Sequence, residues 1–105
     1  MAERSASERY FGAFEFEFQR ERAAVLTRYG QKAEAAIAKC QALLDHIDEG
    51  DATEVEAYKA SRRAAMKAID DLCFQREMLG VFDNARVHQF YRVPPPLGEP
   101  APTID

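Results

Sequence analysis

Proline is absent from the first 93 residues, and all five prolines lie between positions 94 and 102. A proline in a helix interior costs about 3 kcal/mol, so its absence permits long uninterrupted helices. The same stretch is rich in alanine and poor in β-branched residues, which also favours helix. We therefore predict an all-α domain over residues 1–93, followed by a proline-rich disordered tail over 94–105.

The first half of the chain has apolar residues at intervals of three and four, with a mean spacing near the helical period. The ladder consists of Phe11, Phe14, Phe18, Val25, Tyr29, Ala33, Ala36, Cys40, Leu44 and Ile47. Arg22 occupies its one polar position. This pattern predicts one long helix over about 6–48. Phe and Glu alternate over 14–18, which is typical of a strand, so an extended segment there is the alternative.

A second helix is predicted over about 52–79. Gly50 is expected to end the first helix in a left-handed conformation, and Asp51 or Thr53 to cap the second. Gly80 is expected to end it. Because the connection is short, the two helices must lie antiparallel as neighbours.

A short third element is predicted over about 82–92. It is either a helix capped by Asp83 or an extended segment, because Pro94 biases Val93 away from helix.

Residues at the same level of a hairpin that turns near Gly50 have numbers summing to about 100, because both helices rise equally per residue. This register places Cys40 and Cys73 roughly 20 Å apart, too far for a disulfide. It also places the aromatic residues near the N-terminus opposite those after position 81. The residues predicted to bind a partner at this aromatic end are Phe11, Phe14, Phe18, Phe82, Phe90 and Tyr91.

A two-helix hairpin buries little apolar surface. We therefore predict that two copies pair with twofold symmetry as a four-helix bundle. The alternative is a monomeric three-helix bundle in which 81–92 folds back on the hairpin.

Composition excludes several classes of function. The net charge of −4 argues against nucleic-acid binding, which usually requires a basic excess. No apolar run approaches the roughly 20 residues of a membrane span, and no signal sequence is evident. The two cysteines do not suggest a disulfide framework. We expect a cytoplasmic protein without membrane association.

Three groups of polar residues were weighed as sites. The acidic turn 45–56 lacks the spacing of a calcium loop, so a solvated turn is favoured. His46 and His88 are predicted to lie far apart and to bind no metal together. The basic residues of 59–67 (Lys59, Arg62, Arg63 and Lys67) are expected to form a solvated face.

The sequence thus predicts a non-enzymatic interaction protein, with no catalytic residues, cofactor or metal. Its expected partners are a second copy and another protein, bound through the aromatic end or the tail. The alternatives are a small-molecule or metal binder using the bundle core, and a nucleic-acid-associated regulator using Lys59–Lys67.

Overall fold

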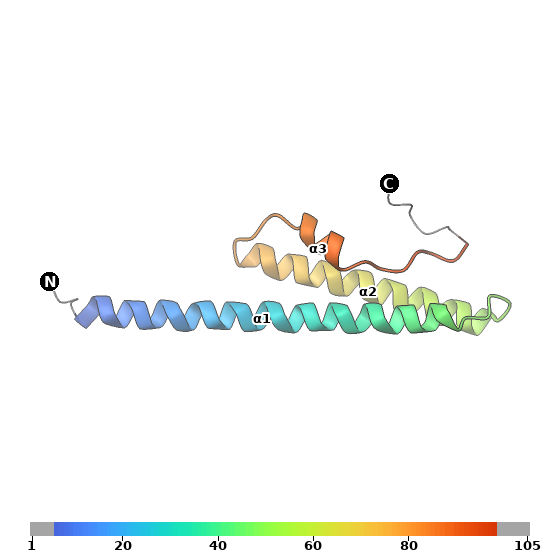
Figure 1. Cartoon of the computed structure of the whole chain (residues 1–105), viewed down its shortest axis with the longest axis horizontal. Coiled ribbons are helices and arrows are strands. Elements are labelled where there is room, and N and C mark those ends of the chain that lie inside the picture. The colour runs from blue at the N-terminus through green and yellow to red at the C-terminus, as the bar shows by residue number, and fades with distance from the viewer. Residues whose placement is uncertain (1–5, 99–105) are drawn as a thin grey trace.

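The computed structural model describes residues 6–98, excluding the side chains of residues 6–16 and of Phe18. Three helices follow one another: α1 (Ala6–Asp45), α2 (Ala52–Met78) and α3 (Ala85–Phe90). α1 and α2 lie side by side as an antiparallel hairpin, and α3 lies against α2 (Figure 1). The predicted helical hairpin and short third element are confirmed. The backbone of 14–18 is helical, so the extended alternative for that segment is wrong.

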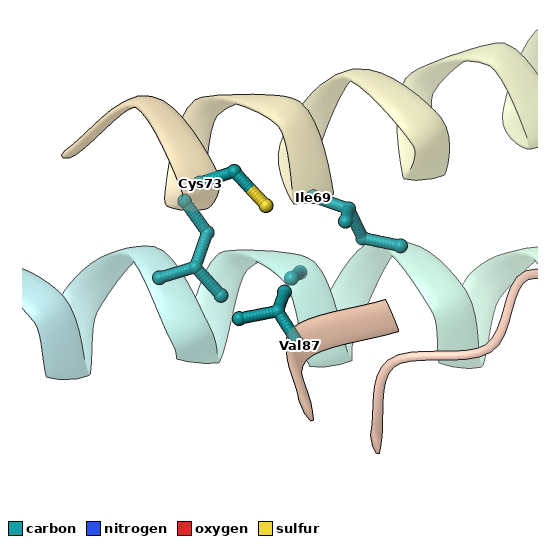
Figure 2. Close-up of a cluster of buried hydrophobic side chains, with 5 residues drawn as sticks. Ile69, Cys73 and Val87 are labelled. Carbon is teal, nitrogen blue, oxygen red and sulfur yellow. The ribbon is translucent and has the colours of Figure 1, made fainter. Parts of the chain in front are cut away.

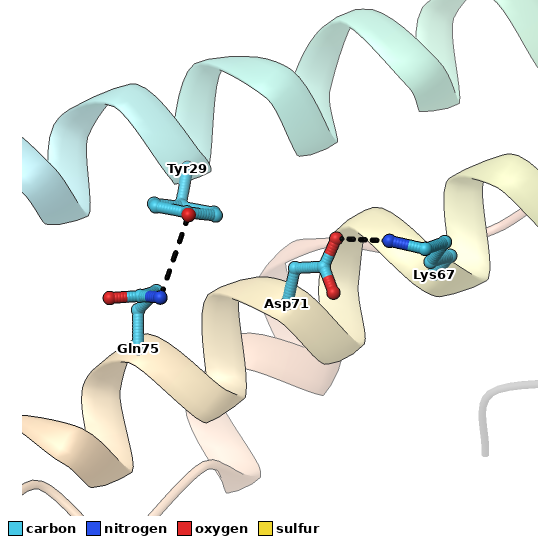
Figure 3. A network of polar contacts seen from close by, with 4 residues as sticks. All are labelled: Tyr29, Lys67, Asp71 and Gln75. Atoms are coloured by element: carbon cyan, nitrogen blue, oxygen red, sulfur yellow. Dashed lines mark hydrogen bonds and ion pairs between the residues drawn. The ribbon is translucent and has the colours of Figure 1, made fainter.

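Contacts between α1 and α2 confirm the predicted register. A guanidinium nitrogen of Arg22 donates a hydrogen bond to the carbonyl of Leu79. The Gln75 amide lies 3.5 Å from the Tyr29 hydroxyl (Figure 3). Arg22, the polar interruption in the α1 ladder, thus places a cation at the C-terminal end of α2, where the helix dipole favours positive charge.

The turn between α1 and α2 is built by aspartate side chains. The carboxylate of Asp51 accepts hydrogen bonds from the backbone N–H groups of Thr53 and Glu54, which confirms it as the N-cap of α2. Asp48 accepts from the N–H of Gly50 at 2.9 Å. The expectation that Gly50 is left-handed is wrong, because the described glycines with positive φ are Gly80 and Gly98. The Asp48 side chain closes this turn without a left-handed residue.

Gly80 ends α2 and redirects the chain. Its φ is +89°, its N–H donates to Glu77, and the N–H of Val81 donates to the carbonyl of Arg76 at 2.8 Å. This pair of bonds is a Schellman motif. Arg76 then holds the returning chain through the Asn84 side chain and the Asp83 carbonyl.

The core lies where all three helices meet. Ala33 of α1, Ile69, Leu72 and Cys73 of α2, and Val87 of α3 form one buried cluster (Figure 2). The small side chains of Ala33 and Ala65, both fully buried, allow close packing of α1 on α2. Cys40 and Cys73 are both free and buried, as predicted.

The residues after α3 follow α2 as an extended segment, which we call the strap (92–97). The Tyr58 hydroxyl donates to the carbonyl of Pro95 at 2.5 Å, and Arg62 Nε donates to the carbonyl of Pro94 at 2.9 Å. Pro94 is buried. The tail was expected to be disordered from residue 94, whereas the described residues 94–97 lie along α2, which donates to the carbonyls of Pro95 and Pro94. Residues 99–105 lie outside the described part.

Candidate interaction surface

The hairpin has an open end, opposite the turn at 46–51, made of α1 before Arg22 and the connection 79–84. α1 has 40 residues and α2 has 27. Because the end of α2 is level with Arg22, the first 16 residues of α1 extend beyond it (Figure 1). At about 1.5 Å per residue this projection is roughly 24 Å long. Within the described residues, no other element lies beside it.

Three of the six residues predicted to bind a partner have described side chains, and these lie in two places. The side chains of Phe11, Phe14 and Phe18 lie outside the described part of the chain. Phe82 is 77% exposed in the connection after α2. Phe90, at the end of α3, is 74% exposed and packs edge-on against Tyr91, with ring centroids 5.0 Å apart.

Tyr91 contacts the middle of α1 instead of its beginning. An ideal Cβ on Gly30 would lie 2.8 Å from the Tyr91 hydroxyl, so only glycine permits this approach without a shift. The expected position of 82–91 opposite residues 11–18 is therefore wrong for Tyr91. The reason is that the chain reverses direction at Gly80. The register assumes two straight antiparallel helices, so it does not apply to residues after the end of α2.

Two exposed apolar residues of α2 were not among those predicted to bind a partner. Phe74 and Met78 are 57% and 68% exposed and lie one helical turn apart. Phe82, in the connection after α2, is exposed as well, and we call these three exposed apolar residues near the open end the end patch. In the sequence, Phe74 and Met78 lie off the main apolar ladder of α2, and this position indicated that they would be exposed.

The basic residues of α2 do not act as one positive face. Lys59 pairs with Glu56 at 3.7 Å, and Lys67 pairs with Asp71 at 2.8 Å (Figure 3). Both pairs are exposed ion pairs of a helix surface and contribute little to stability. Arg62 donates a hydrogen bond to the strap, and Arg63 is exposed to solvent.

Among the described residues, no group of three or more histidine, cysteine or acidic side chains is arranged to hold a metal ion. His88 lies near α2, with its Nε2 3.9 Å from Cys73 Sγ, and not near the beginning of α1 as the register suggested. Burial, and secondarily the charge of Asp70, raises the pKa of the Cys73 thiol, so it is neutral near pH 7. A neutral buried thiol is a weak nucleophile.

Comparisons with known proteins give no family. No family model, curated protein or solved structure matches the chain. The protein can therefore be classified by its fold alone, which is an all-α helical hairpin with a third helix folded back on α2. No helix in the described part is long and apolar enough to cross a membrane.

Proposed function

We propose that the chain is a non-enzymatic interaction protein that functions as a homodimer. The observation that carries this proposal is the projection of α1 beyond α2 together with the exposed end patch. The sequence of the projecting segment contains five aromatic residues, Tyr10, Phe11, Phe14, Phe16 and Phe18, and the exposed apolar side chains beside it are those of the end patch. Exposed apolar surface of this kind is typical of protein interfaces.

The proposed partner at this surface is a second copy of the chain. In a twofold pairing of open ends, the projecting α1 segment of each copy packs against the end patch of the other. At the level of each projection, the α1 segment of one copy then lies beside α1 and α2 of the other, and together the two hairpins make the proposed four-helix assembly. Because each copy supplies both a projection and a patch, one contact is made twice, as twofold symmetry requires.

We also propose a reducing compartment, the cytoplasm. Cys40 and Cys73 are free and are buried at separate positions along the hairpin, so the fold requires no disulfide. The alternative functions have less support. Ser61 is the one buried polar or charged residue of the described part, whereas a binder of polar ligands or metals in the core needs at least two inward polar groups. The charge pairing of Lys59 and Lys67 weakens the nucleic-acid alternative.

Light scattering at two protein concentrations tests the dimer. We expect twice the chain mass of 11.9 kDa, with dissociation on dilution. Phe74→Lys combined with Met78→Lys should shift the protein to monomer without loss of helix signal, because lysine is disfavoured in interface cores. Ala64→Lys, at an exposed position in the middle of α2, is the matched control and should remain dimeric. A wild-type protein that is monomeric at every concentration overturns the proposal.

The α1 projection is tested separately by Phe14→Asp. If Phe14 lies in the interface, the variant is a folded, helical monomer, because a charge disfavours the interface and not the single-chain core. Loss of folding would instead show that Phe14 belongs to the core of a single chain.

A further inference from the structure

A groove runs along the side of the hairpin where α3 and the strap return over α2. Its volume is about 560 Å³, within the range of small-molecule sites. Its apolar lining comes from Met66 and Ile69 of α2 and from Tyr91 and Val93 after α3. This composition suits an aliphatic or aromatic body. The groove is separate from the end patch, because none of Phe74, Met78 and Phe82 lines it.

Two arginines at this groove are held by their Nε atoms. Arg62 also contacts the Met66 sulfur through Nη1 at 3.5 Å, which leaves its Nη2 without a partner among the described residues. Arg62 Nε donates to the carbonyl of Pro94, and Arg92 Nε donates to the carbonyl of Gln89 at 3.3 Å. Each guanidinium has five N–H donors. The terminal edges of both groups therefore keep donors for a ligand. A guanidinium fixed in this way loses less side-chain entropy when it binds a carboxylate.

The charge balance of the groove is locally positive. The cations Arg62 and Arg92 line it against the single carboxylate of Asp70. The whole chain, in contrast, has a net charge of −4. A preference for an anion at this groove would therefore come from these few residues and not from the overall field of the protein.

We propose that this groove binds small amphipathic carboxylates, with the acid group on the Arg62 and Arg92 guanidiniums and the apolar body on Met66 and Ile69. Arginine matches a carboxylate with two parallel hydrogen bonds, which sets the orientation of the ligand. This site does not depend on the homodimer. It also differs from the predicted binder in the bundle core, because it lies at the surface and was created by the return of α3 and the strap.

Calorimetric titration of the full chain with decanoate, decanol and decylamine, all below micelle-forming concentrations, tests the head-group preference. We expect saturable binding of decanoate, with decanol about tenfold weaker or more, because one charge-assisted pair accounts for a factor of this order. Decylamine, which the net charge favours, should bind weakest. Equal binding of the alcohol and the acid, tighter binding of the amine, or no saturable binding of decanoate overturns the proposal.

Two variants with the same loss of charge locate the site. Arg92→Gln should weaken decanoate binding about fivefold or more while leaving decanol binding unchanged. Arg63→Gln, exposed on α2 and outside the groove, should change decanoate binding by less than about twofold, as expected of a screened distant charge. Amide chemical shifts in the wild-type protein should respond to decanoate at 62–70 and 88–93. Equal weakening by both variants, or shifts centred elsewhere, would show that the acid binds outside this groove.

Discussion

Tyr58 is the largest fully buried side chain of the described residues, and its hydroxyl holds the strap. Tyr58→Phe keeps the ring but leaves the Pro95 carbonyl without its donor. We expect the free energy of unfolding to fall by about 1 to 2 kcal/mol, the usual result for a buried acceptor that loses its partner. Chemical denaturation followed by circular dichroism measures this loss.

Tyr29→Phe is the matched control for Tyr58→Phe. The Tyr29 hydroxyl accepts only a long contact of 3.5 Å from Gln75, and its ring, which Lys32 approaches at 5.1 Å, is retained in phenylalanine. This substitution should cost under about 0.5 kcal/mol. Equal losses from the two substitutions would show that the strap adds nothing to stability.

The buried thiols give a pH dependence at the residue scale. Burial raises the pKa of Cys40, opposed in part by hydrogen bonds from Tyr58 and Ser61, and burial also raises the pKa of Cys73. The unfolded chain therefore loses these protons first as pH rises. Stability from the two thiols is complete below about pH 8.5, the ordinary thiol value, and is lost above it. Denaturation midpoints should be flat from pH 7 to 8 and fall between about pH 9 and 10.

The variant Cys40→Ala combined with Cys73→Ala tests the cause of that fall. It should be less stable at pH 7, because buried side-chain volume is lost. Its stability should nevertheless decline less between about pH 9 and 10 than that of the wild type. An unchanged slope would assign the pH dependence to other groups, such as Tyr58, whose pKa is also raised by burial.

At the scale of elements, Gly80 determines where the chain turns back. Its φ of +89° lies in the left-handed region, and a Cβ there would meet no atom within 4 Å. Gly80→Ala should therefore cost about 1 kcal/mol through backbone strain alone. Gly80→Asn should cost less, because asparagine tolerates this conformation better. Thermal unfolding measures both, and equal costs would contradict the strain explanation.

The turn at Gly80 also explains where the sequence-based prediction failed. The helical ladders predicted α1 and α2 within a few residues, and the contact of Arg22 with Leu79 agrees with the predicted register. Both depend on local periodicity. The register does not apply beyond Gly80, because a left-handed residue changes the direction of the chain. The spacing of apolar residues in a helix does not predict the new direction.

The strap and the groove were missed for a related reason. The prolines correctly predict that 94–97 is not helical. They do not indicate that Tyr58 and Arg62 of α2 donate hydrogen bonds to the carbonyls of Pro95 and Pro94. Those contacts join residues 32 to 37 positions apart. They depend on how α3 packs through Val87, which no local pattern encodes.

At the scale of the whole molecule, the single chain is strongly elongated. Its radius of gyration is 20.3 Å and its longest extent is 74 Å, whereas a compact domain of this length has a radius of about 13 Å. Such a shape exposes much of each helix, which is the general reason to expect association. In the proposed dimer, the end patch (Phe74, Met78 and Phe82) restricts how the copies overlap, because a partner that covers it lies at the open end and not at the turn.

Small-angle X-ray scattering distinguishes the possible assemblies. Overlap of the two open ends should give a dimer whose longest dimension exceeds the 74 Å of one chain, with a cross-section thickened only near its centre. Two hairpins paired along their whole length would keep the length near 74 Å and double the cross-section instead. A monomer would retain the radius of gyration of 20.3 Å at all concentrations. The lysine variant of Phe74 and Met78 should return the scattering curve to that of the single chain, since it removes the patch on which the partner's α1 packs.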